Sequence, residues 1–136
     1  MDDIVLNKAA IIERCVARVR QEYGGDEGNL VDDLRRQDSI VLNLQRACEA
    51  AIDLAMHLVR VRRLGIPQES RDAFGFLRDA GLIAPELAAQ MLAMVGFRNV
   101  AVHDYRRLDL AIVRSIVTDH LGDFLEFARV AAGHAA

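Results

Sequence analysis

The amino-acid sequence predicts an all-α protein, an up-and-down bundle of about five helices in a single domain over residues 1–136. Apolar residues make up 52% of the chain and recur at alternating steps of three and four, the spacing of one helical face. No run of residues alternates with the period of two that is typical of strands. The chain has only two prolines, and alanine, leucine and arginine are plentiful, a composition that favours helices.

The first predicted helix follows the acidic start of the chain. Asp2 or Asp3 can cap its N-terminus, and Gly24-Gly25 can end it. Its apolar face consists of Val5, Ala9, Ile12, Val16, Val19 and Tyr23. We expect this face to pack against the rest of the bundle.

A long helix is expected from Leu30 to Leu64, where Gly65-Ile66-Pro67 ends it. Two adjacent apolar stripes run along this helix and form a wider arc than one core-facing stripe needs. The stripes are Ile40, Leu44, Ala47, Ala51, Leu54, Leu58 and Val61, and Val41, Cys48, Ile52, Ala55 and Val59. The helix is either central in its bundle or shared with a second subunit. We favour the second alternative, a homodimer, because a small bundle rarely surrounds one helix completely.

Three further helices are predicted in the second half of the chain. A short one begins near Ser70 and ends at Gly81, and the next begins at Ala84-Pro85, where proline suits the first turn. The last helix is capped by Asp109. The apolar stripe of the helix after Pro85 is Leu87, Met91 and Met94. Arg98 then occupies the position where this stripe should continue.

Charge and composition exclude several classes of protein. The net charge of -3 means that contact with nucleic acid would need a local basic patch. Cys15 and Cys48 lie in apolar patterns and are expected to be buried free thiols, which fits a reducing cytoplasm. The start of the chain predicts no signal peptide, and no stretch approaches the roughly 18 apolar residues of a membrane span. Motifs for phosphate-binding loops and zinc sites are missing, so we expect a cytoplasmic protein with no metal and no cofactor.

The segment GFRNVAVHDYRR (Gly96 to Arg107) concentrates polar side chains near the end of an apolar helix. On a straight helix, Arg98 and His103 are about 140° apart around the axis and do not share a face. Asn99 and His103 are about 40° apart, and Arg98 and Tyr105 about 20° apart. All four serve one site only if the helix ends or bends here, or if a second subunit completes the site. The structural alternative is a capping histidine and a salt-bridged arginine.

These residue types suit cleavage of a phosphodiester bond without a metal ion. An imidazole can take a proton from a ribose 2′-hydroxyl or give one to the leaving oxygen. Arg98 can hold the phosphate through two parallel hydrogen bonds and stabilise the charge that develops on it, and Asn99 can orient either partner. Arg106 and Arg107 extend the positive charge beyond His103 and can hold RNA phosphates; otherwise they are solvated.

A second group of polar residues lies on one face of the long helix. Its members are Arg46, Glu49, Asp53, His57 and Arg60. They form either a solvated or salt-bridged face, or a face on which Asp53 and His57 border the cleft and position Arg98 or RNA.

The stretch GFRNVAVHDY resembles the Arg-x4-His-x-Tyr signature of HepT-like toxins in the HEPN superfamily. The resemblance extends to QDSIVLNLQRACEAAIDLAMHLV and to LGDFLEFA, and covers nearly the whole chain from about Asp33. It implies a HEPN-type bundle, a homodimer with a cleft at its interface, and a metal-independent endoribonuclease that is the toxin of a HEPN/MNT toxin–antitoxin pair. Arg98 and His103 would then be the catalytic pair, with Asn99 as a supporting residue.

The resemblance also implies how such a toxin is silenced. An MNT-type nucleotidyltransferase antitoxin would transfer AMP onto Tyr105. If helical phase persists to Tyr105, the AMP phosphate would lie close to Arg98. It would then occupy the guanidinium that otherwise binds the RNA phosphate. The same residues also suit a second class of function, a non-catalytic subunit that binds a nucleotide or a partner nucleotidyltransferase through Arg98 and His103.

Overall fold

The computed structural model describes residues 2–134, and this part of the chain is helical and contains no strand. The helices are α1 (Asp3–Tyr23), α2 (Gly28–Val31), α3 (Leu34–Val61), α4 (Ser70–Asp79), α5 (Pro85–His103), α6 (Leu110–Ser115) and α7 (Leu121–Gly133). A 3-10 turn, η1 (Tyr105–Arg107), follows α5, and a π turn, η2 (Ile116–His120), joins α6 to α7. The prediction of an all-α bundle is confirmed.

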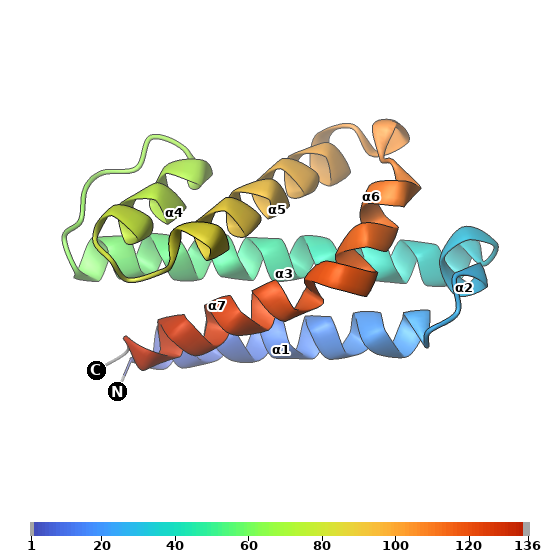
Figure 1. Ribbon diagram of the computed structural model, residues 1–136, viewed down its shortest axis with the longest axis horizontal. Coiled ribbons are helices and arrows are strands. Elements are labelled where there is room, and N and C mark those ends of the chain that lie inside the picture. Colours follow the sequence, from blue (N-terminus) through green and yellow to red (C-terminus); the bar gives the residue numbers. More distant parts are fainter. Residues whose placement is uncertain (1, 135–136) are drawn as a thin grey trace.

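The long helices run up and down beside one another (Figure 1). α1 and α3 pack along most of their lengths, and α7 returns along α1, so that α1 begins and α7 ends at the same end of the bundle (Figure 1). α4 and α5 pack on the other side of α3. Because α5 crosses α3 at an angle, its C-terminal end projects from the body of the bundle (Figure 1).

The ends of α1 follow the sequence signals. The Asp2 carboxylate accepts hydrogen bonds from the backbone N–H groups of Ile4 and Val5, so Asp2 is the N-cap. Gly24 ends the helix with a φ of 57°, a left-handed conformation that favours glycine. Both boundaries therefore depend on local chemistry that the sequence reveals.

The predicted helix from Leu30 to Leu64 is two helices, α2 and α3, and the prediction of its bounds was wrong. The break lies at Asp33, whose backbone is extended and whose carboxylate accepts a hydrogen bond from the backbone N–H of Arg36. An aspartate that caps a helix competes with continuation of the helix before it. At the other end α3 stops at Val61, three residues earlier than predicted.

Both apolar stripes of α3 are buried by the chain itself, with Val61 as the exposed exception. α1, α2, α4, α5 and α7 all contact α3, which is therefore the central helix of the bundle. We had expected the wide apolar arc of α3 to indicate a second subunit. This inference was wrong, because the helices of one chain suffice to cover the arc. Any homodimer must be argued from other residues.

Candidate active site at the end of helix α5

The helix α5 carries the motif and is held by its apolar stripe. Pro85 occupies its first turn, and Leu87, Met91 and Met94 are buried against the core. The helix continues without interruption to His103. Asp104 ends it with φ -152° and ψ 62°, and its N–H closes the last turn on the carbonyl of Val100.

Arg98 lies one turn after Met94 and is partly buried, but its guanidinium is weakly held. Nη2 donates one long hydrogen bond of 3.4 Å to Ser70 Oγ at the start of α4. Nε is sealed from solvent and is the one buried side-chain nitrogen or oxygen within residues 2–134 that has no hydrogen-bond partner. Arg98 forms no ion pair with any other residue that the structure describes, so it is not the salt-bridged arginine of the structural alternative.

Cys48 of α3 lies near the Arg98 guanidinium and is inert. Burial raises the pKa of the Cys48 thiol far above its usual range, although the positive charge of Arg98 acts in the opposite direction. The thiol is therefore neutral and gives Arg98 no compensating negative charge. Both Cys15 and Cys48 are buried free thiols, as predicted.

His103 is the last residue of α5, and its side chain is exposed. Among residues 2–134 its imidazole has no hydrogen bond or ion pair, so it does not cap the helix. Asn99, one turn earlier, is exposed as well. Because α5 does not bend between Arg98 and His103, these two side chains leave the helix about 140° apart.

Tyr105 does not continue the helical phase of Arg98. The helix ends at Asp104, and Tyr105 begins the turn η1, so our expectation that an AMP group there would lie beside Arg98 loses its geometric basis. Tyr105 Oη instead donates a hydrogen bond of 2.9 Å to Asp38 Oδ1, near the start of α3. Burial, followed by this contact with Asp38, raises the pKa of Tyr105.

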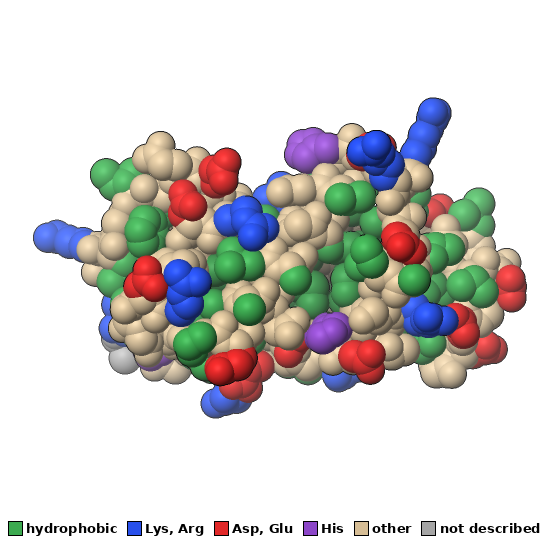
Figure 2. Space-filling model, turned by 45° about the horizontal axis from the view of Figure 1, so that its top comes forward, with side chains coloured by type: hydrophobic (Ala, Val, Ile, Leu, Met, Phe, Trp, Pro, Cys, Tyr) green, Lys and Arg blue, Asp and Glu red, His purple; other side chains and the backbone are tan. Residues whose placement is uncertain are grey.

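Arg106 and Arg107 lie on the surface directly after Tyr105. Arg107 Nε pairs with Asp104 at 3.3 Å, an exposed contact of little energetic weight. Figure 2 shows a histidine beside basic side chains at the projecting upper edge of the molecule. The two arginines that follow His103 are exposed, as is His103 itself.

Asp53 and His57 face the N-terminal part of α1 and form side-chain hydrogen bonds with it. Lys8 Nζ donates to Asp53 Oδ2 at 3.0 Å, and His57 Nε2 lies 2.6 Å from Asp2 Oδ2. Arg60 Nη2 donates a hydrogen bond of 2.9 Å to His57 Nδ1, so the proton of the neutral imidazole is on Nε2, which donates a hydrogen bond to Asp2. These contacts correspond to the salt-bridged face, the first of the two alternatives. The sequence could not name these partners, because no local pattern places the α1 N-terminus on this part of α3.

The sequence profile of the ribonuclease HepT-like family matches residues 12–131. The chain belongs to this family. It is 50% identical to the mRNA nuclease HepT of Shewanella oneidensis, over 96% of this chain and 97% of that relative. The resemblance that the motif indicated is confirmed.

Solved structures show the same HEPN-type fold. A tri-AMPylated Shewanella oneidensis HEPN toxin in complex with MNT antitoxin superposes with a TM-score of 0.92 at 49% identity, covering 98% of this chain and 99% of that chain. A toxin–antitoxin structure with AMP-PNP gives 0.90 at 49% identity, over 96% and 99%. YutE, a cytosolic protein of unknown function from Bacillus subtilis, shares the fold at 11% identity, with a TM-score of 0.82 over 96% and 87%.

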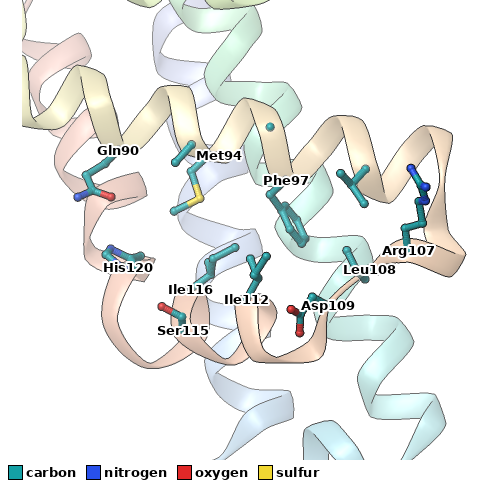
Figure 3. A pocket seen from close by; sticks show the side chains of 13 residues that line it. Gln90, Met94, Phe97, Arg107, Leu108, Asp109, Ile112, Ser115, Ile116 and His120 are labelled. Carbon is teal, nitrogen blue, oxygen red and sulfur yellow. The ribbon is translucent and has the colours of Figure 1, made fainter.

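This HepT-like chain also has a groove that the sequence did not reveal, of about 460 Å³, between α5 and the α6–η2 segment (Figure 3). Met94, Phe97, Ile112 and Ile116 line it, with polar groups such as Arg107 and His120 at its rim (Figure 3). The sequence signal that could have indicated this groove is the pair of small residues, Ala93 and Gly96, on this face of α5.

Two further properties of the described chain bear on the chemistry. Residues 2–134 contain no group of three or more histidine, cysteine, aspartate or glutamate side chains that could hold a metal ion. Within the same residues no helix combines the length and the apolar character that crossing a bilayer requires.

Proposed function

We propose that this chain is the toxin of a HEPN/MNT-type toxin–antitoxin pair and that it cleaves RNA in the cytoplasm as a metal-independent endoribonuclease. Two relatives support the proposal: the mRNA nuclease HepT at 50% identity and the HEPN toxin bound to MNT antitoxin at 49% identity. Both likenesses extend over almost the full length of each chain.

The state of Arg98 is the observation that carries the chemistry. A guanidinium has five N–H donors, and within residues 2–134 the one hydrogen bond of Arg98 is the long contact with Ser70. Leaving a buried donor without a partner costs stability, so natural proteins rarely tolerate it away from functional sites. A phosphate of the RNA backbone is a suitable acceptor, because its oxygens match the planar donor pair of arginine.

His103 supplies the proton transfers in this mechanism. Its exposed imidazole takes the proton of the ribose 2′-hydroxyl, whose oxygen attacks the adjacent phosphorus. The bond to the 5′-oxygen breaks, this oxygen leaves with the electron pair, and the imidazolium gives it a proton. Arg98 stabilises the negative charge that develops on the phosphate oxygens, and Asn99 orients the substrate or the imidazole. The products carry a 2′,3′-cyclic phosphate and a 5′-hydroxyl, and no step requires a metal or a cofactor.

A second copy of the chain completes this site. Arg98 and His103 leave an uninterrupted helix in different directions, and the helix bend that would have joined them within one chain is absent from α5. In a homodimer, the guanidinium of one protomer and the imidazole of its partner face a common cleft. The projecting end of α5 is the natural place for that interface (Figure 1).

The antitoxin silences the toxin by transferring AMP to Tyr105. The tri-AMPylated HEPN toxin of Shewanella oneidensis supports AMP transfer to a toxin of this family, and the tyrosine of the Arg-x4-His-x-Tyr motif makes Tyr105 the proposed acceptor. Tyr105 is two residues from His103, so a nucleotide on its hydroxyl narrows the approach to the imidazole. The added phosphate also places negative charge beside Arg106 and Arg107, where an RNA phosphate would otherwise bind.

Cleavage of RNA by the purified chain in EDTA tests the proposal. We expect His103→Ala to slow cleavage about 100- to 10,000-fold, the usual contribution of acid–base catalysis. Arg129→Ala is the matched surface control and should cleave as the wild type does, since Arg129 is exposed and pairs with Glu126 on α7.

Two outcomes would contradict the proposal in different ways. If EDTA abolishes cleavage while His103→Ala leaves it intact, the chemistry is wrong. If the wild-type chain binds nucleotide tightly but neither cleaves RNA nor arrests growth when it is expressed alone, the chain is a non-catalytic subunit instead.

A further inference from the structure

A contact between distant segments adds a residue to the modification site. Tyr105 Oη and Asp38 Oδ1 are 2.9 Å apart and belong to residues 67 positions apart in the chain. The carboxylate belongs to α3 and the phenol to η1, at the end of the bundle where α5 projects. The fold therefore sets a carboxylate against the oxygen that would accept AMP.

We propose that Asp38 orients the Tyr105 hydroxyl and accepts its proton during AMP transfer. This inference rests on the proposed function, which makes Tyr105 the acceptor. In the step, Tyr105 Oη bonds to the α-phosphorus of the ATP that the antitoxin binds, and the bond from this phosphorus to the β-phosphate bridging oxygen breaks. Pyrophosphate leaves with the electron pair of that bond, and the phenolic proton passes to Asp38 and then to water.

The acceptor needs a base because its phenol is protonated at neutral pH. Burial and the neighbouring carboxylate both raise the pKa of Tyr105. A neutral hydroxyl is a weak nucleophile until an adjacent group takes its proton as the new bond forms. Such a base must lie within about 2.6–3.2 Å of the oxygen that it deprotonates, and Asp38 meets this requirement.

Asp38 is available for this role. Its carboxylate is exposed and forms no ion pair with any of residues 2–134, so no guanidinium or ammonium group neutralises it. Tyr105 is its one side-chain hydrogen-bond partner in that part of the chain. The Tyr105 side chain is 47% exposed, which leaves it open to a second enzyme.

Two arginines line the same groove as this carboxylate and place positive charge where an incoming triphosphate would approach. Arg18 of α1 and Arg46 of α3 line, together with Asp38, a shallow groove of about 450 Å³. Arg18 pairs with Glu22 at 3.4 Å, whereas Arg46 has no ion pair within residues 2–134. The titratable and charged neighbours of Tyr105 on its own segment are His103, Asp104, Arg106 and Arg107.

The rate of AMP transfer to the full-length chain by its cognate nucleotidyltransferase, with ATP, tests this role. Intact-protein mass spectrometry measures the modified fraction over time. Asp38→Asn keeps a hydrogen-bond acceptor but loses the base, and we expect the rate at pH 7 to fall at least about 100-fold. Asp38→Glu should recover part of the rate. Asp32→Asn removes the same charge from an exposed position between α2 and α3 and should react at the wild-type rate.

The pH profile separates proton acceptance from a structural role. Below the pKa of the phenol, each pH unit raises the phenolate fraction about tenfold. The rate of AMP transfer to Asp38→Asn depends on the phenolate fraction, because this variant has no base at position 38. The rate for the wild type does not depend on it. The ratio of wild-type to Asp38→Asn rates should therefore fall as the pH rises from 7 to 9, which a misplaced tyrosine alone would not produce.

The outcomes distinguish this inference from the proposed function. If Tyr105→Phe is not modified and Asp38→Asn reacts at the wild-type rate, or the rate ratio does not change with pH, the role of Asp38 is refuted and Tyr105 remains the acceptor. If Tyr105→Phe still gains AMP, the assignment of the acceptor fails, and the role of Asp38 fails with it.

Discussion

Two polar clusters of this protein contain the same residue types and differ in how they are bonded. Where α1 meets α3, His57 is buried and both of its ring nitrogens have partners, Asp2 and Arg60. At the end of α5, Arg98 has one long hydrogen bond and a buried nitrogen without a partner, and His103 has none that the structure describes. One cluster is satisfied, and the other retains its hydrogen-bonding capacity.

The difference shows how to separate structural from functional polar residues. A buried polar group with all its partners contributes to folding, because losing one partner leaves the other desolvated and unbonded. A partly buried guanidinium with unused donors contributes little to folding and is available to a ligand. The comparison predicts that changes in the first cluster affect stability and changes in the second affect activity.

The largest effect is expected for Arg98→Ala in an RNA cleavage assay. We expect activity to fall about 100- to 1,000-fold, the usual result of removing a donor that stabilises a developing charge. The thermal unfolding midpoint should change little, because the guanidinium has only one weak bond to lose. Arg60→Ala serves as the control and should leave cleavage by the folded protein unchanged. A large loss of stability in Arg98→Ala, with normal cleavage, would reverse the assignment.

His57→Ala should give an effect of intermediate size and of the opposite kind. Its loss leaves the Asp2 carboxylate and the Arg60 guanidinium without their shared partner and opens a space in the packing of α1 on α3. We expect the free energy of unfolding to fall by about 1–3 kcal/mol, measured by urea denaturation. Cleavage per folded molecule should match that of the wild type. A loss of activity without a loss of stability would show that His57 borders the RNA-binding cleft.

The smallest effect concerns the pH dependence of the first cluster. The hydrogen bond from His57 lowers the pKa of Asp2 below its ordinary value of 3.8, so its stabilising contribution is present above that value and is lost as the pH falls through the folded-state value. Asp2→Asn keeps a good N-cap but removes the charge. The wild type should therefore unfold at a higher temperature than Asp2→Asn at pH 7, and this difference should narrow as the pH falls below 3.8. A difference that does not change with pH would show that the charge of Asp2 is not involved.

Several features of the fold could be predicted because their causes are local. The start of α1 at Asp2, its end at Gly24 and the first turn of α5 at Pro85 follow from capping chemistry within a few residues. The position of Arg98 in the stripe of Met94 follows from helical periodicity alone. The Arg-x4-His-x-Tyr motif could likewise be recognised without coordinates.

Other features could not be predicted because they depend on how the helices pack. The local pattern around Asp33 is compatible both with an aspartate that caps a new helix and with one continuous helix, so the break there could not be predicted. The two stripes of α3 were compatible with a central helix or a dimer interface. The partners of His57 and the groove beside Phe97 involve segments distant in the sequence.

By itself the sequence determined the helices, their faces and the polar motif at the end of an apolar helix, since helix formation depends on neighbours three and four positions apart. Only the tertiary structure decided which polar groups are bonded and which remain available, and that Asp38 meets Tyr105 across 67 residues. The reason is that such contacts depend on the angles at which the helices cross, and the joint packing of many side chains determines those angles.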